Sequence, residues 1–261
     1  MTWIEALILG IVQGLTEFLP VSSSGHLEIG KVLLNVEVKE DLSFTILVHF
    51  ATVLSTITVF FREIRDLSRG LFAFRWNNET RYVANILVSM IPVLVVGFLF
   101  REEVESLFSG NLALVGGALL VTAALLVSTQ LVKSGTKKIP LPDAFIMGIA
   151  QAVAVIPGIS RSGATISAGL LLKNDRGEVA RFSFLMVLIP IIGAALLDIL
   201  SFSSSTGEPA VSTGALIIGF LAAYGSGYLA CSWMIRLVKK GNLYWFALYC
   251  ALVGIVSIIF A

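Results

Sequence analysis

Residues 3–30 read WIEALILGIVQGLTEFLPVSSSGHLEIG, an apolar run that stops at Pro20 and a serine–glycine cluster and then resumes briefly. A proline removes a backbone donor and ends or kinks a helix, while serines cap the start of the next one. The stretch therefore predicts a helix, a polar break and a second short helix. At membrane depth such a re-entrant hairpin is tolerated only where protein or a watery cavity surrounds it.

The same pattern returns in the second half of the chain. Eight residues within 6–25 recur identically 138 positions later, and the second break reads PGISRSG (residues 157–163). Residues 1–132 and 140–261 then each hold one hairpin and three spans. Because three is an odd number, the second repeat enters the membrane in the opposite orientation to the first. Inverted repeats with broken helices place a site near the midplane, where the breaks meet. A duplicated scaffold without a shared site is the alternative, but polar breaks without a function are costly there.

Composition places the whole chain in a membrane. Its 261 residues are 57% hydrophobic and 13% charged, with a mean hydropathy of +0.93, whereas soluble domains are about 25% charged. Two cysteines, both within apolar segments, make no disulfide framework. Six apolar stretches are long enough to span the hydrocarbon core. They are residues 44–61, 82–100, 112–132, 182–202, 213–235 and 243–260. The expected fold is a single all-α integral membrane domain with six transmembrane helices plus two re-entrant helical hairpins.

The basic residues predict the orientation. All but four of the 18 lysines and arginines lie in residues 62–81, 133–138, 173–181 and 236–240, which share one side of this topology. Basic loops mark the cytoplasmic side. Both termini are then expected outside a cell membrane, with the first hairpin entering from outside. No nucleic-acid partner is expected.

Two residues of the first helix are candidate metal ligands. Gln13 and Glu17 are four apart and therefore share one helix face. A carboxylate and an amide oxygen suit a hard cation such as Mg²⁺ or Ca²⁺. Gln13 alone is equally well explained by an interhelical hydrogen bond. Glu17 is a functional candidate because an ionised group is expensive in the hydrocarbon region.

The polar breaks are candidate phosphate sites. Backbone N–H groups at the start of a helix are unpaired and attract anions, and both breaks add hydroxyl groups, which can also serve as helix caps. Arg161 adds a planar fork that suits phosphate oxygens, and His26 can act as acid, base or nucleophile. The candidate phosphate-binding residues are Ser22, Ser24, Gly25, Ser160, Ser162 and Gly163.

The motifs GIVQGLTEFLPVSSSGH (residues 10–26) and IPGISRSGATIS (residues 156–167) closely resemble those of the undecaprenyl-diphosphate phosphatase family, also called the bacitracin resistance protein family. The similarity extends more loosely along nearly the whole chain. It implies a membrane hydrolase that removes the terminal phosphate of a polyprenyl diphosphate with the help of a divalent cation. Such an enzyme recycles the lipid carrier for peptidoglycan synthesis and confers bacitracin resistance.

The resemblance also implies roles for residues. Gln13 and Glu17 match the family's Glu/Gln-x-x-x-Glu pair. Many members have Glu at the first position. The neutral Gln13 would therefore bind a metal more weakly, and Glu17 would act as the general base. In the expected mechanism Ser23 attacks the outer phosphorus, His26 handles the proton and Arg161 stabilises phosphoryl charge.

Several alternatives stay open at the level of sequence. His26 or water could be the nucleophile in place of Ser23. A transporter or flippase of polyprenyl phosphate lipids is the rival function, because inverted repeats with broken helices also build transporters. The expected partners are the polyprenyl diphosphate substrate and membrane lipids, and a homodimer is left open. An outward-facing first hairpin predicts that phosphate is released outside.

Overall fold

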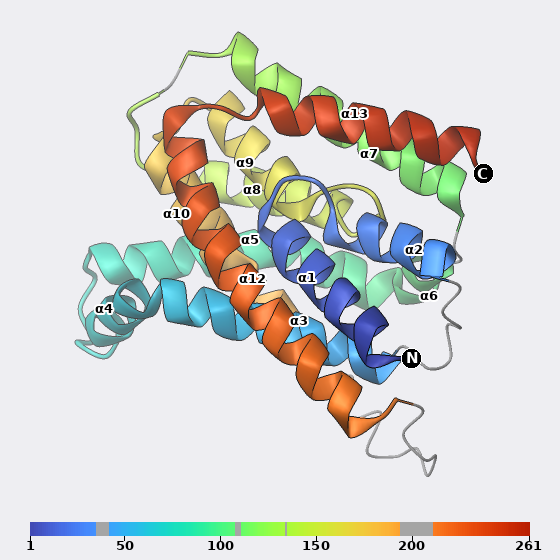
Figure 1. The fold of residues 1–261 in the computed structure, drawn as a ribbon. Coiled ribbons are helices and arrows are strands. Elements are labelled where there is room, and N and C mark those ends of the chain that lie inside the picture. Colours follow the sequence, from blue (N-terminus) through green and yellow to red (C-terminus); the bar gives the residue numbers. More distant parts are fainter. Residues whose placement is uncertain (35–41, 108–110, 134, 194–210) are drawn as a thin grey trace.

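The computed structural model describes residues 1–34, 42–107, 111–133, 135–193 and 211–261, and these fold almost entirely into helices (Figure 1). The first half contains α1 (Trp3–Phe18), α2 (Ser23–Leu34), α3 (Leu42–Val59), α4 (Phe61–Leu71), α5 (Asn78–Leu99), α6 (Arg101–Ser106) and α7 (Leu112–Ser128). The second half contains α8 (Leu141–Val153), α9 (Arg161–Leu171), α10 (Arg176–Met186), α12 (Thr213–Lys240) and α13 (Tyr244–Ile259). The expected all-α class is confirmed.

Each broken apolar stretch forms two helices joined by a short connection. In the first half α1 turns back through residues 19–22 into α2, and the two helices pack together (Figure 1). A capping box between Thr2 and Glu5 begins α1, which satisfies backbone donors that would otherwise be unpaired. In the second half α8 and α9 pack together across residues 154–160. Both breaks fall where the proline and serine signals predict them.

At least three of the described helices are long and apolar enough to cross a membrane. They are α5, α7 with its terminal 3-10 turn, and α12. A fourth crossing is formed if α3 and α4, which meet at an angle of 75°, count as one. Helix α13 has 16 residues and is shorter than its predicted stretch. The stretch predicted at residues 182–202 lies partly outside the described residues.

Helix α4 differs from the expectation of a charged loop over residues 62–81. Its apolar residues Phe61, Ile64, Leu67 and Leu71 recur at helical spacing between charged residues. An apolar stripe beside a charged face is typical of a helix in a membrane interface, which is the alternative to α4 completing a crossing with α3. The many charges of this segment concealed the helical period.

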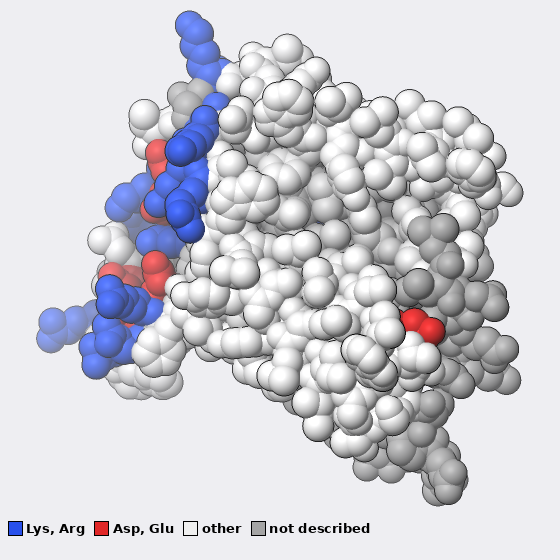
Figure 2. Space-filling view, in the orientation of Figure 1, with Lys and Arg blue, Asp and Glu red and all other residues white. Residues whose placement is uncertain are grey.

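Lysine and arginine side chains gather at one end of the molecule (Figure 2). This is the end that carries α4 in Figure 1, and both chain termini lie toward the opposite end. Between the two ends the visible surface is almost free of charge (Figure 2). An uncharged band with many exposed large apolar side chains suits contact with lipid, where polar groups are costly.

Glycines let the longest helices approach closely. A Cβ atom at Gly10 of α1 would clash with the carbonyl oxygen of Gly219 in α12, and one at Gly14 would clash with Ser226. Helices α7 and α13 meet in the same way, since a Cβ at Gly116 would lie 2.6 Å from the carbonyl oxygen of Gly254. Small residues at such crossings drive helix association in membranes. They fix α1, which carries Gln13 and Glu17, against α12.

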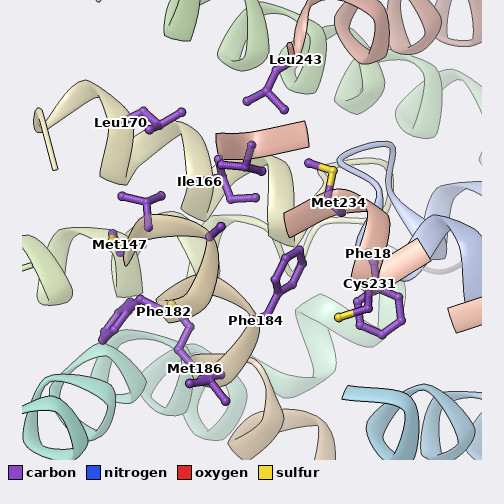
Figure 3. Packing of buried hydrophobic residues seen from close by; sticks show 14 of the residues in the cluster. Phe18, Met147, Ile166, Leu170, Phe182, Phe184, Met186, Cys231, Met234 and Leu243 are labelled. Carbon is purple, nitrogen blue, oxygen red and sulfur yellow. The ribbon is translucent and has the colours of Figure 1, made fainter. Parts of the chain in front are cut away.

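The main apolar core lies between the two halves. It joins residues of α1, α8, α9, α10 and α12 (Figure 3). Phe18 at the end of α1 packs edge-on against Phe184 of α10, with ring centroids 6.0 Å apart. Phe18 follows Glu17 directly, so this contact anchors the end of the helix that carries the carboxylate.

Substituting Gly116 by valine is expected to destabilise the protein by about 1–3 kcal/mol, because the new methyl groups overpack the contact with α13. Gly117→Val is the matched control, since a Cβ at Gly117 meets no atom within 4 Å. Thermal unfolding in detergent measures both variants. An equal Tm for the two would contradict the close packing of α7 against α13.

Candidate active site

The two breaks lie against each other. The Ser162 hydroxyl of α9 donates a hydrogen bond to the carbonyl oxygen of Leu19, at 3.3 Å. A Cβ atom at Gly25 would lie 3.0 Å from the Cα atom of Gly158, so the backbones of the breaks touch. Motifs about 140 residues apart in sequence therefore form one site.

Glu17 is the centre of this site. Its Oε1 atom accepts a hydrogen bond and ion pair from Nη2 of Arg161, at 2.7 Å. Its Oε2 atom accepts hydrogen bonds from the Ser23 hydroxyl, at 2.6 Å, and from Nε2 of Gln13, at 2.9 Å. The Glu17 side chain is 5% exposed and that of Arg161 is 28% exposed. A buried carboxylate needs such partners, because its desolvation is otherwise uncompensated.

The serines of both breaks hold the following helices in the same way. Ser22 accepts a hydrogen bond from the backbone N–H of Gly25, and Ser160 accepts one from Gly163, at 3.3 and 3.0 Å. In each break the hydroxyls of two serines that are two positions apart lie 3.3 Å from each other. These pairs are Ser22 with Ser24 and Ser160 with Ser162. Ser22 has a φ of 70°, a conformation that is uncommon for a non-glycine residue and often marks functional sites.

Arg161 is held at the first turn of α9 by a residue that the sequence did not single out. Thr122 of α7 accepts a hydrogen bond from the backbone N–H of Ser160 and donates one to the carbonyl oxygen of Gly158, at 3.0 and 3.1 Å. Gly158 has a φ of 97°, which favours glycine. A threonine within an apolar span usually bonds only its own helix, so no sequence signal indicated this bridge.

His26 lies beside the serine break but bonds elsewhere. Its Nδ1–H donates to the carbonyl oxygen of Ser22, at 2.8 Å. The neutral ring then accepts at Nε2 from the hydroxyl of Tyr249 in α13, at 2.7 Å. Within the described part of the chain, no hydrogen bond joins His26 to Ser23. The other histidine, His49, bonds the carbonyl oxygen of Thr45 in its own helix, as expected of a packed polar residue.

Tyr249→Phe is expected to lower kcat by roughly five- to tenfold, because it removes one hydrogen bond from His26 and keeps the ring. Tyr244→Phe is the control, since Tyr244 is also on α13 but packs against Trp245 rather than His26. Steady-state kinetics measure both. Equal kcat values would show that the Tyr249 hydroxyl does not support His26.

The donor set suits a hard cation. Oε1 of Gln13 is buried and accepts no hydrogen bond from any described residue, and it belongs to a side chain that already contacts Glu17. Among the described residues no group of three histidine, cysteine or acidic side chains could hold a metal. A cation here would therefore rely on the Gln13 amide oxygen and the Glu17 carboxylate, with water and phosphate oxygens as further ligands.

The second repeat lacks counterparts of the acidic and basic groups of the first. In the 138-residue register Glu17 aligns with Val155, Ser23 with Arg161 and His26 with Ala164, whereas Gln13 is retained as Gln151. The first half thus provides the carboxylate, the nucleophile candidate and the histidine. The second half provides the arginine.

The fold and the site define a helical membrane protein in which two broken helices bring a carboxylate, an arginine and serine hydroxyls together. The chain belongs to the family described as bacitracin resistance protein BacA, whose model matches residues 6–256. It is a multi-pass membrane protein. The resemblance inferred from the two motifs is confirmed.

Curated relatives match over nearly their whole length. An undecaprenyl-diphosphatase of Bacteroides fragilis is 55% identical over 263 residues, which cover 99% of this chain and 98% of the relative. An undecaprenyl-diphosphatase of Parabacteroides distasonis is also 55% identical with the same coverage. One from Methanobrevibacter smithii is 39% identical over 98% of this chain and 96% of the relative.

Proposed function

We propose that this chain is an undecaprenyl-diphosphatase. It removes the terminal phosphate of a membrane-bound polyprenyl diphosphate and returns the monophosphate carrier to peptidoglycan synthesis, which confers resistance to bacitracin. The observation that carries the proposal is the network in which Ser23, Gln13 and Arg161 all bond Glu17. These are the parts that phosphoryl transfer needs, namely a positioned nucleophile, a base beside it and a cation for the developing charge.

Ser23 is the nucleophile of the proposed mechanism. Its hydroxyl proton already points to Oε2 of Glu17, so Glu17 takes the proton as the serine oxygen bonds to the outer phosphorus. The bond from that phosphorus to the bridging oxygen breaks, and the prenyl monophosphate leaves with the electron pair. Water then attacks the phosphorus of the phosphoserine and the bond from phosphorus to the serine oxygen breaks. Glu17 returns the Ser23 proton to that oxygen, and both protons of the water leave on inorganic phosphate.

The charge of the transferred phosphoryl group is stabilised from both halves of the chain. Nη2 of Arg161 donates a hydrogen bond to Glu17, and the other N–H groups of the guanidinium can donate to phosphate oxygens. The N-termini of α2 and α9 add unpaired backbone donors from the two breaks. His26, whose neutral ring accepts at Nε2 from Tyr249, protonates the leaving oxygen after Nε2 has itself gained a proton.

A divalent cation, Mg²⁺ or Ca²⁺, would be held by Glu17 and Gln13. When bound, it would neutralise part of the diphosphate charge. The unpartnered amide oxygen of Gln13 supports this assignment. Chelation followed by add-back of each ion, with phosphate release as the readout, tests the requirement. Full activity in chelator would contradict it.

The finer arrangement of the fold is part of the proposal. Six transmembrane helices and two re-entrant hairpins form two inverted repeats, residues 1–132 and 140–261. The matching serine caps of the two breaks support the duplication. The gathering of basic side chains at one end (Figure 2) supports a cytoplasmic position for that end and an outside position for both termini.

Cysteine labelling tests the orientation. Both native cysteines are buried, so an impermeant maleimide reports on introduced cysteines. Ala261→Cys lies at the C-terminus and Arg75→Cys lies between α4 and α5. In intact cells the first should be labelled, and the second only after permeabilisation. The opposite pattern would reverse the proposed orientation and place phosphate release inside.

The activity itself is tested with purified protein in vesicles. Phosphate release from undecaprenyl diphosphate, together with a trapped phosphoserine at Ser23, would support the proposal. A phosphate on His26 would move the nucleophile, and a lack of any phospho-enzyme would favour direct attack by water. Lipid translocation without hydrolysis would replace the enzyme by a flippase.

A further inference from the structure

The Glu17–Arg161 pair lines part of a small cavity. Its volume is about 10 Å³, close to the room that one water molecule needs. Glu17 and Arg161 line it together with Gln151 of α8 and Ser183 of α10, while Phe18 and Phe184 form part of its apolar wall. Neither Ser23 nor His26 is among its lining residues, so the cavity meets the proposed nucleophile only through Glu17.

Gln151 has an unmet hydrogen-bonding requirement in this cavity. Its side chain is 1% exposed, and its Oε1 atom accepts no hydrogen bond from any described residue. Its Nε2 atom has only a 3.9 Å contact with the sulfur of Met90. The repeat explains the weak contact of Nε2, because Gln13 donates its Nε2–H to Glu17 whereas the position that corresponds to Glu17 is Val155. A buried amide oxygen without a donor is destabilising, so a donor inside the cavity is required.

The neighbouring hydroxyls cannot be that donor. Thr165 donates its proton to the carbonyl oxygen of Arg161, at 2.8 Å. The Ser183 hydroxyl lies 2.6 Å from that of Thr165, whose proton is already used, so Ser183 donates to Thr165. Ser162, which also lines the cavity, donates to the carbonyl oxygen of Leu19. Thr52 and Thr56 likewise donate to carbonyl oxygens of their own helix. The cavity thus presents acceptors from Gln151 and Ser183 and donors from Arg161.

The size of the cavity limits what it can hold. Its volume suits one water molecule and is too small for a phosphate group. Water is neutral, fits, and has two protons for acceptors and lone pairs for a donor.

We propose that one water molecule, bound between Gln151, Ser183 and Arg161, helps to position the Arg161 guanidinium, which Glu17 also bonds. The water donates to Oε1 of Gln151 and Oγ of Ser183 and accepts from Arg161. Gln151 is thereby a positioning residue for Arg161. This role rests on the proposed function, whereas the water site itself does not.

Radiolytic footprinting in ¹⁸O water tests the site without any activity measurement. Hydroxyl radicals formed from bound water label adjacent aromatic rings. Phe184 should be labelled in the native protein, and Phe182, fully buried on the same helix but absent from the cavity wall, should not. In Gln151→Met the labelling of Phe184 should fall to the level of Phe182. Equal labelling of the two rings in the native protein would overturn the proposal.

Kinetics test the positioning role. Gln151→Met should lower kcat roughly tenfold with KM unchanged, because a displaced arginine weakens the transition state rather than ground-state binding. Thr56→Val, which alters the cavity wall, should lower kcat in the same direction. Thr58→Val is its matched control, since both hydroxyls bond a carbonyl one turn earlier and only Thr56 lines the cavity.

The outcomes separate the two proposals. Loss of Phe184 labelling in Gln151→Met with an unchanged kcat would refute the positioning role and retain the water. A native protein that labels Phe184 but hydrolyses no diphosphate would contradict the proposed function and leave the water site standing.

Discussion

Glu17→Gln is expected to lower kcat about 10³-fold, because the amide cannot take the Ser23 proton in the attacking step. The variant keeps the shape of the side chain. It removes the negative charge that faces Arg161 at 2.7 Å and replaces one acceptor by a donor that opposes the Arg161 N–H groups. Single-turnover phosphate release separates this chemical defect from a change in lipid binding.

Glu5→Gln is the control for Glu17→Gln. Glu5 lies on the same helix and only caps its first turn, so its loss should leave kcat unchanged and cost a small amount of stability. Thermal unfolding of both variants shows whether the fold survives. If Glu17→Gln folds and keeps more than about a tenth of the activity, Glu17 is not the base.

Arg161→Lys is expected to lower kcat about 10²-fold even though the charge is kept. A lysine can pair with Glu17 or reach a phosphate oxygen, but it lacks the planar fork that does both at once. KM for the lipid should change less than kcat, because charge develops on the phosphoryl group mainly in the transition state.

Arg236→Lys is the matched control for the arginine. Arg236 bonds a carbonyl of its own helix near the basic end of the molecule, far from the two breaks in sequence. Its substitution should leave both constants unchanged. An Arg161→Lys enzyme with a kcat within about threefold of the native value would assign Arg161 to the support of Glu17 rather than to phosphate.

The sequence predicted the features that depend on short spacing. The helix breaks follow from Pro20 and the serine clusters, and the contact of Gln13 with Glu17 follows from their separation of four on one helix. The basic end of the molecule follows from the positions of lysine and arginine along the chain.

Contacts between distant helices could not be predicted in the same way. Tyr249 is one of several aromatic residues in an apolar helix, and its bond to His26 depends on how α13 packs beside α2. Thr122 and Gln151 read as ordinary polar residues of membrane helices, which usually bond their own backbone or a neighbouring helix. Only the packing of the two halves shows that they support Arg161 and its surroundings.

Ser23 of the first half aligns with Arg161 of the second, so the two halves have diverged in the charge that they bring to the site. Two equal copies would present the same groups to each leaflet, and their like charges would repel where the breaks touch. Here one copy is the acidic partner and the other the basic partner, joined at Glu17 and Arg161. Under the proposed function, a half of the chain that lacked its counterpart would hold either the carboxylate or the arginine but not both, much as one subunit of an obligate heterodimer holds half of a shared site.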